Sequence, residues 1–101
     1  MVNNDRLLSF LGICMRAGAM IYGAETVEKT IREGKAQLLL YASDTSENSL
    51  KRVLNAAGDR DVPVRRLPCL KDELSFALGR YCGIVCTTDT GFAKKILEMM
   101  E

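Results

Sequence analysis

The sequence of 101 residues has no histidine and no long apolar run, and its formal net charge is only +1. Without histidine, the usual base of nucleophilic triads is missing, and neither a GxGxxG loop nor a P-loop is present. We therefore expect a protein without catalytic activity or a cofactor. A large positive excess, typical of nucleic-acid binders, is also missing, so any basic surface must come from local arrangement.

Features of membrane and secreted proteins are scarce as well. No apolar stretch approaches the length of a membrane span, and the amino-terminal MVNNDRLLSFLG has no basic leader before its apolar residues. We expect a cytoplasmic protein that is not associated with a membrane. Hydrophobic residues make up 48% of the chain, which suits one compact domain over residues 1–101.

The chain has four cysteines, Cys14, Cys69, Cys82 and Cys86, but no CxxC pair. Without a chelating pair or histidine, a metal site is a weak interpretation, and we expect none. Cys82 and Cys86 are four residues apart in YCGIVCTT, which in a strand would place both side chains on one face. All four are expected to be free thiols that pack as small apolar side chains.

Hydrophobic periodicity and turn residues predict helices that alternate with strands. Leu7, Leu11 and Cys14 follow helical spacing and Gly18 ends that stretch, whereas QLLLYA is a continuous apolar run typical of a central strand. Pro63 favours an edge position for its strand. In chain order, we predict a helix in 7–18, a strand at 19–22, a helix at 24–33, a strand at 37–42, a helix within 43–58, a strand at 62–67, a helix at 70–79, a strand at 82–88 and a last helix from 89 or 90 to 100.

This alternation implies a three-layer α/β/α sandwich. The continuous apolar strands should be covered by helices on both faces. Leu39, Leu40, Ile84 and Val85 are accordingly predicted to lie in the core on central strands.

Several stretches, in this order, carry a resemblance that extends from Leu8 to Ile96: RAG, GAETVEKTIREGKA, LLLYASD, VPV, ELSFALG and TDTGFAKK. The sequence resembles the ribosomal protein L7Ae family, in particular its small bacterial YlxQ-type members. The resemblance implies an α/β/α sandwich around a small mixed four-stranded sheet. It also implies a non-catalytic RNA-binding domain that recognises kink-turns, in which a sharply bent internal loop exposes sheared guanine–adenine pairs.

In that family, an Asn-Glu-x-x-Lys motif on the helix after a glycine addresses the guanine edges. The matching positions here are Glu25, Thr26 and Lys29, so only the lysine is retained. Gly23 allows close backbone approach, and the helix that follows it presents free amides suited to phosphate. The structural alternative is that Gly23 only turns the chain and that Glu25–Lys29, like Glu28–Arg32, is an ordinary i,i+4 pair.

The second contact that the resemblance implies is the loop LGRYCGI, beside the amino end of that helix. Arg80 could meet phosphate and Tyr81 could stack on a base, although both also suit a solvated loop. Lys35, Arg65, Arg66 and Lys71 are candidates for a basic rim. The predicted RNA-binding residues are Gly23, Ala24, Glu25, Thr26, Lys29, Arg80, Tyr81 and Cys82.

The expected partner is structured RNA, ribosomal or another non-coding RNA, with association with the ribosome or its assembly. Two other classes are weighed against this hypothesis. The first is a protein-interaction module of the same fold that has lost kink-turn recognition, consistent with the near-zero net charge and the changed motif. The second is a small-molecule enzyme that relies on carboxylates.

Overall fold

The computed structural model describes residues 4–101, in which five helices and four strands alternate along the chain. The helices are α1 (Asn4–Arg16), α2 (Ala24–Arg32), α3 (Glu47–Arg60), α4 (Lys71–Leu78) and α5 (Thr90–Met99). The strands are β1 (Met20–Tyr22), β2 (Leu38–Tyr41), β3 (Val64–Arg66) and β4 (Ile84–Thr87). None of these five helices is long and apolar enough to cross a membrane. The predicted order of helices and strands is confirmed.

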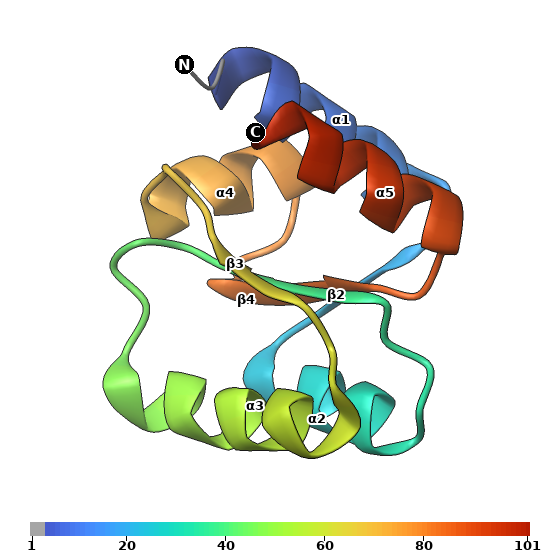
Figure 1. The fold of residues 1–101 in the computed structure, drawn as a ribbon. Coiled ribbons are helices and arrows are strands. Elements are labelled where there is room, and N and C mark those ends of the chain that lie inside the picture. Colours follow the sequence, from blue (N-terminus) through green and yellow to red (C-terminus); the bar gives the residue numbers. More distant parts are fainter. Residues whose placement is uncertain (1–3) are drawn as a thin grey trace.

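The strands form one mixed sheet in the order β1-β4-β2-β3. Strand β4 runs antiparallel to both β1 and β2, whereas β3 is parallel to β2 and is reached through α3. Figure 1 shows α1, α4 and α5 on one side of this sheet and α2 and α3 on the other. The predicted three-layer α/β/α sandwich around a small mixed four-stranded sheet is therefore confirmed.

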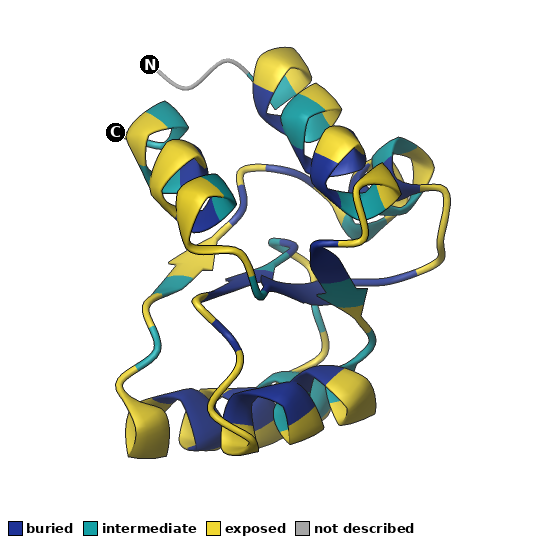
Figure 2. Cartoon of the chain, turned by 90° about the vertical axis from the view of Figure 1, so that its right-hand side faces the viewer, coloured by how far each residue is buried: buried dark blue, intermediate teal, exposed yellow. Residues whose placement is uncertain are grey.

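Side chains of the two central strands alternate between two hydrophobic clusters. Leu40 and Val85 pack with α1, α4 and α5, whereas Leu39 and Ile84 pack with α2 and α3. All four are buried, as predicted. Figure 2 shows that the buried residues of the helices lie on the sides that face the sheet. The sheet is thus covered on both faces.

Strand β3 is an edge of the sheet, as Pro63 predicts. Pro63 stands just before the strand, and its carbonyl accepts a hydrogen bond of 2.9 Å from the Leu39 amide. Arg65 and Arg66 on β3 are exposed. Charged side chains on an edge strand discourage pairing with another chain, which accounts for this arginine pair structurally.

The third helix is two residues longer than the sequence predicts. It continues through Gly58 to Arg60 and ends at Asp61, whose φ of 57° is left-handed. Gly58 is exposed on this helix, and a single glycine there weakens a helix without ending it. Aspartate is one of the few non-glycine residues that adopt the left-handed conformation readily, so the chain turns at Asp61.

The prediction that Cys82 and Cys86 share one face of a strand is wrong. Strand β4 begins only at Ile84, so Cys82 lies in the preceding loop. Its side chain packs into the cluster with α1, α4 and α5, whereas Cys86 packs into the cluster with α2 and α3. The two-residue periodicity of a strand does not extend back through the turn at Gly83.

All four cysteines are buried, free thiols. Burial raises the pKa of Cys14 and Cys69 to about 11 and that of Cys86 to about 12, and it raises the pKa of Cys82 despite the nearby Lys71 ammonium. Within residues 4–101, no three Cys, Asp or Glu side chains gather in a way that could hold a metal ion.

We expect these thiols to be unreactive in the folded chain at neutral pH and reactive in urea, because the thiolate is the nucleophile. Because folding raises these pKa values, the stabilisation that they contribute is complete below about pH 9 and is lost as the pH rises towards 12. Thiol labelling with and without urea, and urea midpoints at pH 8 and pH 10, test both statements. A thiol that reacts within seconds in the native chain would contradict this prediction.

Candidate functional site

The amino terminus of α2 is uncapped and accessible to a ligand from solvent. Gly23 precedes the helix with φ 90° and ψ 135°, a conformation that side-chain-bearing residues rarely adopt, and its amide donates to the Ile84 carbonyl at 3.0 Å. No side chain caps this helix. Within residues 4–101, the amides of Ala24, Glu25 and Thr26 donate no hydrogen bond to the protein. These donors are suited to an external anion.

The loop from Gly79 to Gly83 is fixed by hydrogen bonds from inside the fold. The Ser75 hydroxyl donates to the Cys82 carbonyl and accepts from the Cys82 amide, both at 3.0 Å. At the other end, the Gly83 carbonyl accepts from the Ala42 amide and from the Thr45 hydroxyl. A Cβ atom on Gly83 would lie 3.1 Å from the Thr45 Oγ1 atom, so glycine permits this close approach.

The open helix terminus and this loop lie side by side around a hollow of about 180 Å³. Its polar side chains are the hydroxyls of Thr45, Ser46 and Ser49 around the start of α3, and the ammonium of Lys71 at the start of α4. The lining residues are Gly23, Ala24, Thr45, Ser46, Ser49, Lys71, Tyr81, Cys82, Gly83 and Ile84. The hollow therefore combines hydrogen-bond donors from three helices with a positive charge.

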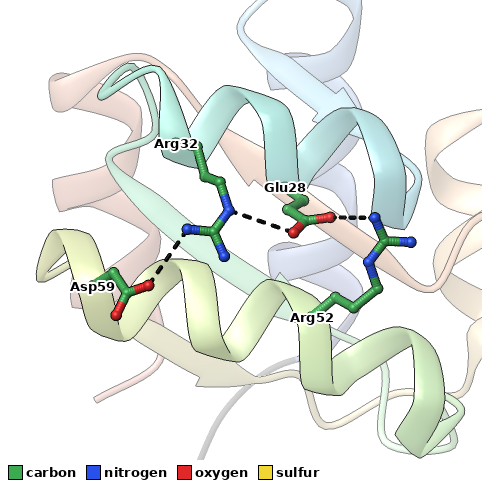
Figure 3. A network of polar contacts seen from close by, with 4 residues as sticks. All are labelled: Glu28, Arg32, Arg52 and Asp59. Carbon is green, nitrogen blue, oxygen red and sulfur yellow. Dashed lines mark hydrogen bonds and ion pairs between the residues drawn. The ribbon is translucent and has the colours of Figure 1, made fainter.

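A second hollow, of about 440 Å³, lies along the outer side of α2 and reaches Arg52 on α3. Figure 3 shows Glu28 between two guanidinium groups. Its carboxylate lies 2.7 Å from Arg52 Nη2 and 3.4 Å from Arg32 Nε, and Arg32 also contacts Asp59 at 3.4 Å. Glu28 is thus neutralised by arginines and joins α2 to α3.

Lys29 is left available by this arrangement. It is exposed and lines the second hollow with Glu25 and Thr26. The predicted alternative of two i,i+4 pairs is half correct, because Glu28 pairs with Arg32 but Lys29 makes no ion pair with any residue in 4–101. A lysine without a partner on an open helix face can donate all its N–H groups to a ligand.

Two cation–tyrosine contacts involve the loop at residues 79–83, and the first of them, between Lys71 and Tyr81, lines the first hollow. The Lys71 Nζ atom is 4.6 Å from the ring centroid of Tyr81, which is 75% exposed. The Arg80 Cζ atom is 6.0 Å from the ring centroid of Tyr22 at the end of β1. One face of Tyr81 is therefore occupied by a cation, and the other is available for stacking.

Comparison with known protein families identifies the family of this chain. The model of the ribosomal protein L7Ae/L30e/S12e/Gadd45 family matches residues 5–97, nearly the whole chain. The chain belongs to this family. The resemblance seen in the sequence is thereby confirmed.

Individual relatives narrow the position within the L7Ae family. The RNA-binding protein YlxQ of Enterococcus faecium is 33% identical over 99 residues, covering 98% of this chain and 95% of the relative. The RNA-binding protein YlxQ of Bacillus subtilis (strain 168) is 32% identical over 96 residues, covering 90% and 91% of the two chains. The chain is therefore a YlxQ-type member of the family.

Solved structures agree on the fold. A Bacillus halodurans protein of unknown function superposes with a TM-score of 0.86 at 27% identity, covering 94% of this chain and 96% of the other. A Giardia lamblia 15.5kD RNA binding protein superposes with a TM-score of 0.71 at 21% identity, covering 97% of this chain and 93% of its own. The second likeness concerns the fold alone.

The predicted site residues of this L7Ae-family chain fall into two adjoining groups. Gly23, Ala24, Tyr81 and Cys82 line the first hollow, and Glu25, Thr26 and Lys29 line the second. Arg80 lines neither hollow, but it is exposed in the same loop over Tyr22. The structure thus places the amino end of α2 beside the loop at residues 79–83, which is the arrangement that the resemblance implies.

Cys82 differs from the other predicted contacts. Only 4% of its surface is exposed, and both its amide and its carbonyl are bonded to Ser75. Cys82 therefore supports the loop from inside rather than offering a free polar group to a ligand.

Sequence reasoning missed the three hydroxyl residues Thr45, Ser46 and Ser49 as site residues, because they lie in the segment 43–58 for which the sequence predicts only a helix. Among the predicted rim cations, Lys71 lines the first hollow. Arg66 donates to the Ser43 carbonyl at 3.4 Å and lines neither hollow, and Lys35 follows the far end of α2.

Proposed function

We propose that this chain is a non-catalytic, cytoplasmic RNA-binding protein that recognises structured, kink-turn-like RNA and associates with the ribosome or its assembly. Membership of the L7Ae family and the names of the two YlxQ relatives support RNA as the ligand. The proposed contact surface is the amino end of α2 with the loop at residues 79–83.

One observation carries this proposal. The unpaired Ala24 amide, the Lys71 ammonium and the hydroxyls of Ser46 and Ser49 line a single hollow with an exposed tyrosine at its mouth, and the unpaired amides of Glu25 and Thr26 follow along α2 in the second hollow. Backbone amides at a helix terminus and a lysine are phosphate ligands, and hydroxyls also donate to phosphate and sugar oxygens. An exposed aromatic ring offers a stacking surface, which single-stranded and looped RNA uses far more than duplex RNA does.

The second hollow supplies the base-reading part of the proposal. Lys29 can donate to guanine O6 and N7, and the Glu25 carboxylate can accept from guanine N1 and N2. Glu28 does not compete for Lys29, because Arg52 and Arg32 hold its carboxylate. Thr26, with one short hydroxyl, replaces the family's glutamate, so affinity for a standard kink-turn should be weaker than in members that keep the full motif.

Arg80→Ala tests the phosphate-binding part. It should weaken a labelled kink-turn RNA and a matched duplex without the internal loop by the same factor, because a phosphate contact is blind to sequence. The slope of log affinity against log salt should become shallower by about 0.7 to 0.9. Lys94→Ala, which changes an exposed lysine on α5, is the matched control and should leave affinity and slope unchanged.

The opposite pattern would refute the proposed surface. If Arg80→Ala binds both RNAs like the parent while Lys94→Ala loses affinity, RNA is bound elsewhere. If the parent binds neither RNA and purifies without excess absorbance at 260 nm, the protein-interaction module becomes the better description.

A further inference from the structure

A groove between α1 and α4 is lined by large apolar side chains that are exposed to solvent. Its volume is about 770 Å³, and none of its lining residues belongs to the two hollows of the candidate RNA site. Phe76 on α4 is 92% exposed and Ile13 on α1 is 47% exposed. Large apolar side chains that converge on one groove indicate an interaction surface.

The floor of the groove is narrow because two helix backbones come close together. A Cβ atom on Gly12 of α1 would lie 2.9 Å from the Ala77 carbonyl oxygen of α4. At the other end of the helix pair, the Asn4 side chain donates to the Pro68 carbonyl at 2.6 Å, which keeps the amino ends of α1 and α4 together. Gly12 and Ala77 thus lie where the two helices approach most closely, and the exposed side chains of Phe76 and Ile13 line the same groove.

The charges in the groove are unequally distributed. Asp5 in the first turn of α1 and Asp72 and Glu73 in the first turn of α4 lie at the amino ends, whereas Arg16 ends α1. Glu73 accepts a hydrogen bond from the Leu70 amide, but none of the three carboxylates forms an ion pair with a residue in 4–101. Three carboxylates against one guanidinium favour a basic occupant and repel phosphate.

We propose that this groove binds an amphipathic basic helix of a partner protein. The apolar face of that helix would cover Phe76 and Ile13, and its lysine or arginine side chains would meet Asp5 and Asp72. The groove is lined by side chains of two helices and by no strand edge, so it cannot add an extended peptide by backbone pairing. Of the common modes of peptide recognition, the one that fits a groove between two helices is binding of an amphipathic helix.

A second copy of this chain fits the groove less well. In a two-fold arrangement, the acidic end of one groove would face the single Arg16 of the other, leaving an excess of two carboxylates on each side. Like charges brought together at an interface are unfavourable, so the charges of the groove are more complementary to a basic partner than to a second copy of this chain. Arg6 and Lys95 do not line the groove itself; they line a neighbouring hollow that shares Asp5, Ser9 and Ile13 with it, so Asp72 and Glu73 are the carboxylates that belong to the groove alone.

A displayed library of random 14-residue peptides, selected on the full chain and depleted on the Phe76→Asp variant, tests this proposal. Enriched peptides should carry apolar residues at three- and four-residue spacing and an excess of lysine and arginine. A synthetic peptide of the enriched sequence should bind at least tenfold more weakly to Phe76→Asp and to the Asp5→Asn, Asp72→Asn double variant. Tyr81→Ala, an exposed aromatic change at the RNA site, is the matched control and should bind the peptide like the parent.

Because Phe76 is almost fully exposed, its replacement should leave the urea midpoint nearly unchanged, so a loss of binding cannot be attributed to unfolding. Enriched peptides without a basic excess, or peptides that bind both groove variants like the parent, would overturn the proposal. A parent chain that sediments as a dimer, and that Phe76→Asp converts to a monomer, would assign the groove to a second copy instead.

Discussion

Leu39→Ala and Leu40→Ala should each lower the free energy of unfolding by about 2–4 kcal/mol. The two leucines are neighbours on β2, and neither has exposed surface, yet they belong to different clusters. Each truncation removes apolar contacts and leaves a cavity between the sheet and a layer of helices. An effect of this size is a large fraction of the total stability of a domain of about 100 residues.

Urea denaturation followed by circular dichroism measures both losses, with Arg65→Ala on the edge strand as a control that should change little. The comparison between the two leucines is the informative part. In a sheet covered on one face only, one of two adjacent positions would be exposed, and its truncation would have little effect. A loss below about 1 kcal/mol at either position would therefore contradict the double coverage.

Lys29→Ala should weaken binding of a kink-turn RNA by about 1–3 kcal/mol and should narrow the gap between that RNA and a scrambled one. The expectation rests on the geometry of α2, where Lys29 is exposed and has no ion-pair partner within residues 4–101. Lysine that reads a base edge contributes to discrimination, whereas lysine that meets phosphate contributes equally to all RNAs.

Titration of the parent, Lys29→Ala and Glu25→Asn with the two RNAs separates these cases. Glu25→Asn restores the amide that the family's motif has at this position and removes a negative charge, so it should strengthen binding of the kink-turn. Lys94→Ala again serves as the matched lysine control. A Lys29→Ala variant that retains the parent's preference for the kink-turn would remove Lys29 from the proposed base-reading role.

Much of the fold could be predicted because its signals are local. The continuous apolar runs around Leu39 and Val85 specify buried strands, and Pro63 marks the edge. The errors arose where the backbone conformation differs from the one that a local signal favours. Gly58 keeps a helical backbone and Asp61 takes the left-handed conformation that ends α3, and Cys82 leaves the expected face because the chain bends at Gly83 before β4 begins.

The candidate site was predicted less completely because it is assembled from distant segments. The hydroxyls at Thr45, Ser46 and Ser49 look like an ordinary helix start until the fold places Thr45 against Gly83. Likewise, the i,i+4 rule finds the pairing of Glu28 with Arg32 but not the shorter contact with Arg52, which comes from another helix. Contacts between helices carry no periodicity that a single sequence reveals.

The strand order has a consequence for the timing of folding during synthesis. Strand β4 is the last of the four to leave the ribosome, yet it pairs with both β1 and β2 and lies between them. Until Thr87 has emerged, β1 has no partner strand, and only the parallel pair of β2 and β3 can form. A nascent chain that stops at Gly83 therefore holds two unconnected parts of a sheet, each with unpaired strand edges. The completion of the sheet is therefore a late event, because it depends on contacts between residues more than 60 positions apart. The loop at residues 79–83 can take its place beside the amino end of α2 only at that stage.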